Sequence, residues 1–170
     1  MRVGVLALQG AFREHILAVE ALGVPSVSVR LPEQLDGLDG LIIPGGESTA
    51  IAKLMRTYGF YDRVRVRHAE GMAVWGTCAG AILMASEIVD ARSDQEPLGL
   101  MDSVVRRNAY GRQVDSFEAD LLIAHIGGPF RGVFIRAPLI ESVGEGVEVV
   151  CQHDGRIVAA RQGDLLATTF

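Results

Sequence analysis

Short apolar runs that alternate with helical segments constrain the fold of this chain more than any other feature. Four such runs, each ended by glycine, proline or polar residues, occupy residues 3–8, 27–29, 41–43 and 72–75. The segment after the first run has apolar residues at helical spacing, at Phe12, Ile16, Val19 and Leu22. Gly23 and Pro25 then supply a helix stop. Apolar strands that alternate with helices predict a parallel sheet covered on both faces.

The second half of the chain predicts strands that pair in the antiparallel sense. Strand candidates occupy residues 117–123, 133–135, 147–152, 156–160 and 165–170. The third and fourth of these flank Asp154-Gly155, a strong signal for a tight hairpin. We therefore expect a single three-layer α/β domain over residues 1–170, in which a mixed sheet with a parallel core is flanked by helices.

The composition limits the class of protein and its partners. Of the 170 residues, 49% are apolar and 22% are charged, which is typical of a folded domain with its own core. The formal net charge is −5 and no cluster of Lys and Arg occurs, which argues against nucleic acid or an anionic membrane as a partner. With two cysteines, no basic leader and no apolar run of about 18 residues, a reduced, cytoplasmic protein is expected.

The strongest chemical signal is the segment 75–80, which reads Trp-Gly-Thr-Cys-Ala-Gly. It follows a strand and precedes a helix, so Cys78 would lie at the apex of a sharp turn that the flanking glycines allow. A helix N-terminus favours a thiolate, and the Ala79 N–H would be free to hold an oxyanion. We therefore interpret Cys78 as a nucleophile rather than as a small buried side chain. Cys151, in an apolar strand without glycine flanks, is interpreted as a core residue.

A second strand-to-helix turn, at residues 44–48, reads Pro-Gly-Gly-Glu-Ser. Its Gly45-Gly46 pair lets the backbone approach a ligand and present N–H groups to a negative oxygen, while Ser48 or Thr49 can cap the next helix. Two such turns at the ends of neighbouring parallel strands would frame one crevice. The sequence therefore predicts an oxyanion hole between Gly46 and Ala79.

A cysteine hydrolase also needs a base, and the sequence does not identify one. The four histidines are His15, His68, His125 and His153. None lies at an expected strand end with a carboxylate at a suitable offset, and only His125, ahead of Gly127-Gly128, is kept as a weak candidate. Arg106, Arg107 and Arg136 offer cations for a ligand carboxylate. No pair of His, Cys or carboxylate residues has the spacing of a zinc site, so no metal is expected.

Taken together, these motifs resemble the glutaminase subunits of pyridoxal 5′-phosphate synthase, which are class I glutamine amidotransferase-like proteins with a flavodoxin-like fold. The matching segments occur in order along nearly the whole chain, at residues 4–10, 13–15, 44–49, 76–80, 107–108, 111–120, 132–138 and 155–160. A cysteine elbow alone fits many hydrolases. The stretch 111–120, which reads GRQVDSFEAD, is the part that is specific to this family.

The resemblance implies hydrolysis of L-glutamine to L-glutamate and ammonia, without a cofactor, and delivery of the ammonia to a synthase subunit. Cys78 would attack the carboxamide, and Ala79 with the Gly45-Gly46 peptide would hold the oxyanion. Gln9 would lie near the partner interface. The residues implied to contact the amino-acid end of the substrate are Gly46, Glu47, Ser48, Arg107, Ile135 and Arg136.

The resemblance also gives an expectation about the end of the chain. In this family the last strand, here Thr168-Thr169-Phe170, is followed by His-Pro-Glu and a final helix, and the His and Glu supply the base and the carboxylate that orients it. We therefore expect that residues 1–170 lack the base and are inactive alone, as a portion of a longer enzyme.

Two other interpretations of the sequence remain open. The chain could be a non-catalytic homologue that docks on the synthase, which would explain a missing base. It could also be another α/β cysteine hydrolase, such as a deglycase or protease relative, which predicts activity without a partner and indifference to glutamine.

Overall fold

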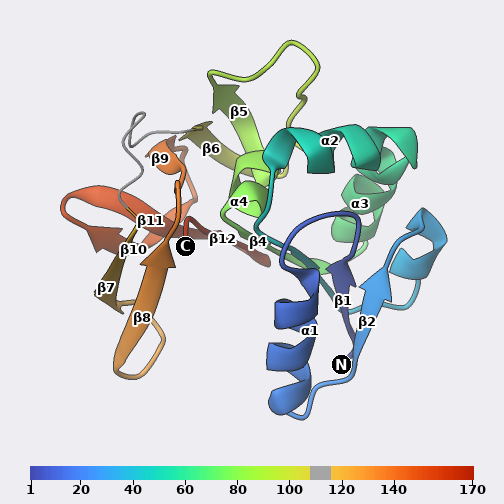
Figure 1. Cartoon of the computed structure of the whole chain (residues 1–170), viewed down its shortest axis with the longest axis horizontal. Coiled ribbons are helices and arrows are strands. Elements are labelled where there is room, and N and C mark those ends of the chain that lie inside the picture. Colours follow the sequence, from blue (N-terminus) through green and yellow to red (C-terminus); the bar gives the residue numbers. More distant parts are fainter. Residues whose placement is uncertain (108–115) are drawn as a thin grey trace.

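A run of parallel strands forms the half of the sheet that ends at the two glycine turns. In this computed structural model, which describes residues 1–107 and 116–170, these strands follow the order β2-β1-β3-β4-β12 (Figure 1). Their bounds are β1 (Val3–Leu6), β2 (Ser26–Val29), β3 (Gly40–Ile43), β4 (Ala73–Thr77) and β12 (Leu165–Thr168). Each neighbouring pair in this run is parallel. The parallel core predicted from the apolar runs is therefore confirmed.

The sheet continues beyond β12 with strands that include antiparallel pairs. The order over the described residues is β12-β11-β9-β6-β5, and β10 pairs off this path along residues 156–161 of β11. The bounds are β5 (Ala85–Val89), β6 (Met101–Arg106), β9 (Leu139–Val143), β10 (Glu148–His153) and β11 (Arg156–Gln162). Asp154-Gly155 forms the turn of the β10–β11 hairpin, as predicted. A separate antiparallel hairpin, β7 (Phe117–Leu122) and β8 (Pro129–Phe134), packs beside β10 (Figure 1).

Helices lie on both faces of this mixed sheet, as the three-layer prediction required. They are α1 (Phe12–Ala21), α2 (Ser48–Thr57), α3 (Phe60–Ala69) and α4 (Ala79–Met84), with a 3-10 turn at Pro32–Leu35. The helices α2, α3 and α4 pack on one face and contribute buried side chains to the main core, among them Ile51, Phe60 and Leu83. On the other face α1 lies along an apolar groove that includes Trp75 and Leu166. Among the described residues, no helix has the length and apolar character needed to cross a membrane.

The helix after Cys78 is shorter than the sequence indicated. We expected it to continue to about Ser86, but α4 ends at Met84 and β5 starts at Ala85. The physical reason is tertiary, because the N–H groups of residues 98–100 donate to the carbonyls of Leu83, Met84 and Ala85. Those carbonyls are thereby satisfied outside the helix, and the chain turns into a strand.

Close packing of β3 on β4 brings the two glycine turns together. Ile43, the last residue of β3, is in register with Gly76 of β4. Gly80, which follows Gly76 by four residues, lies so close to the Ile43 carbonyl oxygen that a β-carbon at Gly80 would overlap it. Gly80 is therefore required by the approach of the two segments rather than by its own φ angle.

We expect Gly80→Ala to lower the free energy of unfolding by about 1–3 kcal/mol, because the added methyl group must push the elbow away from β3. Urea denaturation followed by circular dichroism measures the change. The control is Gly127→Ala, where an added β-carbon meets nothing within 4 Å and should leave stability unchanged. Equal stability of the two variants would contradict the proposed clash.

Candidate active site

Cys78 lies at a strained turn between β4 and α4. Its backbone has φ 48° and ψ −100°, a conformation that residues with a side chain rarely adopt. The turn is held on both sides, because the Cys78 N–H donates to the Thr168 carbonyl (2.8 Å) and the Cys78 carbonyl accepts from the Ile82 N–H (3.2 Å). The thiol is half-buried and is not in a disulfide. The predicted elbow geometry is therefore present.

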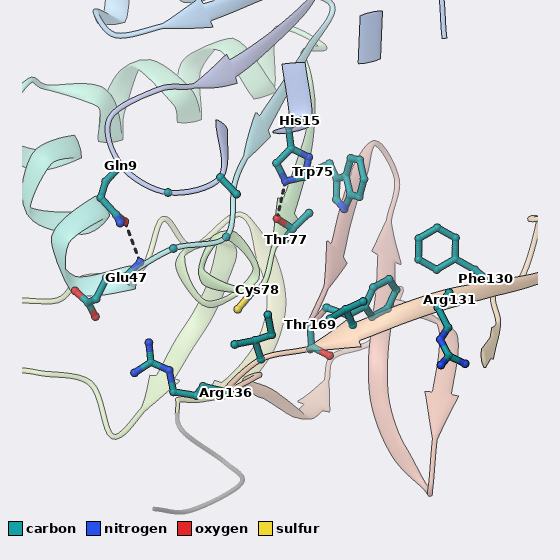
Figure 2. A pocket seen from close by; sticks show the side chains of 17 residues that line it. Gln9, His15, Glu47, Trp75, Thr77, Cys78, Phe130, Arg131, Arg136 and Thr169 are labelled. Carbon is teal, nitrogen blue, oxygen red and sulfur yellow. Dashed lines mark hydrogen bonds between the residues drawn. The ribbon is translucent and has the colours of Figure 1, made fainter. Parts of the chain in front are cut away.

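The Cys78 side chain opens into a cavity of about 700 Å³ (Figure 2). Its walls come from the β1–α1 turn, the β3–α2 turn, the elbow, strand β8 with the residues after it, and the end of β12. Seven residues selected from the sequence line it, namely Gln9, Gly45, Gly46, Glu47, Cys78, Ile135 and Arg136. The structure thus brings together segments that lie more than 100 residues apart in the chain.

Burial, rather than the start of a helix, sets the protonation of the nucleophile. Desolvation raises the pKa of the Cys78 thiol above its ordinary value, although the Ala79 N–H and the positive charge of Arg136 act to lower it. The sequence had led us to expect a stabilised thiolate, and the net direction is the opposite. At neutral pH the thiol is protonated, so an attack on substrate needs a base that removes its proton.

Two backbone segments beside the sulfur are candidates for an oxyanion hole. The Ala79 N–H is hydrogen-bonded to the Cys78 thiol. Across the cavity, a β-carbon built on Gly45 would lie 3.4 Å from the Cys78 β-carbon, so the two turns are in contact. The Gly45 carbonyl accepts from the Ala11 N–H (2.9 Å), and because the peptide is planar the Gly46 N–H points away from Ala11. The Ala11 N–H therefore holds the Gly45-Gly46 peptide in the orientation that this structure describes.

A charged pair lies at one end of the cavity. The Glu47 carboxylate is 3.6 Å from the Arg107 guanidinium, and it accepts from the Ala50 N–H (2.8 Å) and from the Thr49 hydroxyl. Burial acts to raise the pKa of Glu47, but these hydrogen bonds and the charge of Arg107 outweigh it and lower the pKa. Glu47 is thus an anion that also caps α2, the role that the sequence gave to Ser48 or Thr49.

Three of the selected residues do not line the cavity. Ser48 is buried in the first turn of α2, Ala79 is buried beneath the sulfur with its N–H toward it, and Arg107 reaches the site through Glu47. Residues 108–115, which include the first half of the family-specific stretch 111–120, lie outside the described residues.

Several residues that line the cavity were not predicted from the sequence. Trp75, Phe130 and Phe170 give one part of the cavity an apolar wall, and Thr169 lines it with a buried hydroxyl that has no hydrogen-bond partner among the described residues. His15 also lines the cavity, and its Nε2 is 3.1 Å from the Thr77 hydroxyl (Figure 2). A usable signal was present, since α1 starts at the same edge of the sheet as the two glycine turns.

The other histidines lie elsewhere in the described structure. His68 Nδ1 is 3.0 Å from the Met72 carbonyl, and His125, the weak candidate for a base, is exposed and is 3.0 Å from Glu148. His153 is stacked against Phe117. None of these three lines the cavity, so the described histidines offer no evident base beside Cys78 except for His15, which is hydrogen-bonded to Thr77.

The fold and the site define a class of enzyme. A cysteine at a strained elbow, facing a glycine turn at the carboxyl edge of a parallel sheet, is the arrangement of a glutamine amidotransferase, and comparison with solved structures agrees. A crystal structure titled as a glutamine amidotransferase superposes with a TM-score of 0.93 at 53% identity, over 99% of this chain and 88% of that one. The PurLQS structure from Thermotoga maritima shares the fold, with a TM-score of 0.70 at 16% identity over 99% of this chain and 85% of that one.

Sequence comparison identifies the family. Residues 5–170 match the SNO glutamine amidotransferase family, and the chain belongs to it. Two relatives, each named pyridoxal 5′-phosphate synthase subunit PdxT, align with the whole of this chain. The one from Bacillus velezensis is 56% identical over 86% of its length, and the one from Herpetosiphon aurantiacus is 58% identical over 91% of its length. The family resemblance stated from the motifs is therefore confirmed.

We expect alkylation of Cys78 by iodoacetamide in the chain 1–170 to rise with pH through a midpoint above the ordinary cysteine pKa. Arg136→Gln should move this midpoint to still higher pH, because it removes a positive charge that stabilises the thiolate. Mass spectrometry of the labelled peptide separates Cys78 from Cys151. Arg131→Gln is the control, since Arg131 lines the cavity but is paired with Glu118 and Asp120. An unchanged or lower midpoint in Arg136→Gln would contradict the assignment.

Proposed function

We propose that this chain is the glutaminase subunit of a pyridoxal 5′-phosphate synthase, which hydrolyses L-glutamine and passes the ammonia to its synthase subunit. The observation that carries the proposal is the position of Cys78, at a strained elbow and in contact with the Gly45-Gly46 turn. Membership of the SNO glutamine amidotransferase family supports the reaction, and the names of the two relatives support the pathway.

The chemistry follows from the groups beside the sulfur. The Cys78 thiolate adds to the carboxamide carbon, and the oxygen becomes an anion that the Ala79 and Gly46 N–H groups would hold. When the tetrahedral intermediate collapses, the C–N bond breaks and the nitrogen leaves as ammonia, after it has accepted a proton from the base. Water then cleaves the thioester, which releases L-glutamate and restores the thiol.

The charged pair suits the amino-acid end of glutamine. Glu47 offers a carboxylate for the α-ammonium group, and Arg107 and Arg136 offer guanidinium groups for the α-carboxylate. Ile135 supplies an apolar contact, while Ser48 and Gly46 complete the turn that carries Glu47. Figure 2 shows Glu47 and Arg136 on one side of Cys78, with Phe130 and Arg131 on the other. The substrate would therefore enter with its amide toward the sulfur.

The base is proposed to follow Phe170 directly. Because burial raises the pKa of Cys78, catalysis requires a proton acceptor beside the sulfur. Thr169 and Phe170 line the cavity, so the next residues along the chain would enter the same space. We propose that these are the His and Glu of the His-Pro-Glu segment that the family resemblance implies, and that residues 1–170 alone are inactive.

The proposal includes a partner and a cellular location. Ammonia released into water is protonated and is then no longer a nucleophile, so we propose that it is handed over within a complex. Gln9, whose side-chain oxygen accepts from the Glu47 N–H (2.9 Å), lines the cavity and would lie near the synthase subunit. We also propose that the protein is cytoplasmic, since both cysteines are free, as is usual where thiols are kept reduced.

Cys78→Ala should reduce ammonia release from L-glutamine by at least about 10⁴-fold in the full-length protein with its synthase subunit, because the covalent step is lost. A coupled glutamate assay measures the rate. Labelling by 6-diazo-5-oxo-L-norleucine should occur at Cys78 and nowhere else. Cys151→Ala is the matched control and should retain full activity, since Cys151 is a core residue. Activity in Cys78→Ala, or labelling at another residue, would refute the assignment.

A chain that ends at Phe170 should be at least about 10³-fold less active than one that continues through His-Pro-Glu, because the base is removed. Both chains are compared with the same synthase subunit, and gel filtration checks that both still bind it. Equal glutaminase rates would contradict the proposed position of the base and would favour a base within residues 1–170.

A further inference from the structure

One short segment is hydrogen-bonded to both turns that form the proposed oxyanion hole. On the side of the Gly45-Gly46 turn, the Ala11 N–H donates to the Gly45 carbonyl (2.9 Å), and the Gln9 side-chain oxygen accepts from the Glu47 N–H (2.9 Å). On the side of the elbow, His15 Nε2 shares a hydrogen bond with the Thr77 hydroxyl (3.1 Å). The start of α1 therefore bridges the two halves of the site.

His15 contributes little to the hydrophobic core. The helix α1, all of whose residues are described, has no fully buried side chain, and His15 is itself half-buried at the cavity wall. Its ring packs edge-on against Trp75 of β4, with 5.7 Å between ring centres. These two contacts of the His15 ring, with Thr77 and with Trp75, are therefore both with the strand that leads into Cys78.

Thr77 links the His15 side chain to the nucleophile along the main chain. It is buried, it is the last residue of β4, and it precedes Cys78 in the chain. Its main chain is in register with Thr168 of β12, and its hydroxyl is bonded to His15. Burial lowers the pKa of His15, against a weaker opposing effect of Glu14, so the ring is neutral at pH 7 and its bond to Thr77 involves no charge.

We propose that His15 is a positioning residue of the oxyanion hole, which sets the distance between the elbow and the Gly45-Gly46 turn through its bond to Thr77. This inference rests on the proposed function, because it assumes that an oxyanion forms beside Cys78. The segment from Gln9 to His15 then acts as one brace for both donors. A change of a fraction of an ångström in the distance between the two donors weakens the stabilisation of the transition state more than the binding of the substrate.

The expected signature is a loss in kcat without a loss in substrate binding. In the intact synthase complex, His15→Ala should lower kcat for glutamine hydrolysis by about 10–100-fold and leave KM within about twofold. His15→Gln can place its amide near the position of Nε2 and should recover most of the rate, whereas the shorter His15→Asn should not. If His15 acted only in folding, His15→Gln and His15→Asn would have similar kcat values.

A double-mutant cycle tests the contact itself. Thr77→Val removes the hydroxyl that His15 binds while keeping the shape of the side chain, so it should lower kcat to a similar extent. The double variant His15→Ala/Thr77→Val should be no slower than the slower single variant. His68→Ala is the matched control, because His68 makes a comparable bond to the Met72 carbonyl away from the cavity and should leave kcat and KM unchanged.

Several outcomes would overturn the inference. These are full additivity of the two substitutions, a rise in KM with kcat unchanged, or equal rates for His15→Gln and His15→Asn. If His15→Ala does not fold, as judged by circular dichroism, the comparison of His15→Gln with His15→Asn gives the same decision. If the unmodified complex hydrolyses glutamine and His15→Ala has an unaltered kcat, the role of His15 is rejected and the proposed function stands. Absence of glutamine hydrolysis in the unmodified complex would reject the proposed function together with it.

Discussion

The contact between β3 and β4 is the constraint on which the rest of the site depends. Two parallel strands end side by side, and the turns that follow them can meet only because glycines stand where their backbones approach. The Ile43 carbonyl occupies the space that a side chain at Gly80 would need, and Gly45 lies against Cys78. The nucleophile and one candidate oxyanion donor thus come from one turn, and the facing peptide from the other.

The cavity keeps the Cys78 thiol protonated, and it also contains groups that stabilise the thiolate once the proton is removed. Burial keeps Cys78 protonated, while the Ala79 N–H and Arg136 favour the thiolate once a base removes the proton. A thiol with a raised pKa reacts slowly with oxidants and stray electrophiles. The Glu47–Arg107 ion pair lies at one end of the cavity, whereas Arg136 lines the cavity and also favours the Cys78 thiolate.

The sequence predicted the features that depend on local patterns. Apolar runs gave the parallel strands, Gly-x-Cys-x-Gly gave the elbow, and Asp154-Gly155 gave the hairpin. Features that depend on distant neighbours could not be predicted. The end of α4 is decided by residues 98–100, the pKa of Cys78 by burial, and the place of His15 by a strand 62 residues away. The order of β1 and α1 predicts that His15 lies at the same edge of the sheet as the glycine turns, but it does not identify Thr77 as the partner of His15.

The hydrogen bond from the Cys78 N–H to the Thr168 carbonyl has a consequence for the order of folding. Strand β12 lies between β4 and β11 in the sheet, although its residues 165–168 follow both of these strands in the chain. A second bond to the same residue, from the Trp75 indole to the Thr168 hydroxyl, spans 93 residues. Such distant contacts form late and slowly. A nascent chain therefore carries Cys78 without the support that fixes the elbow until residues 165–168 have been made.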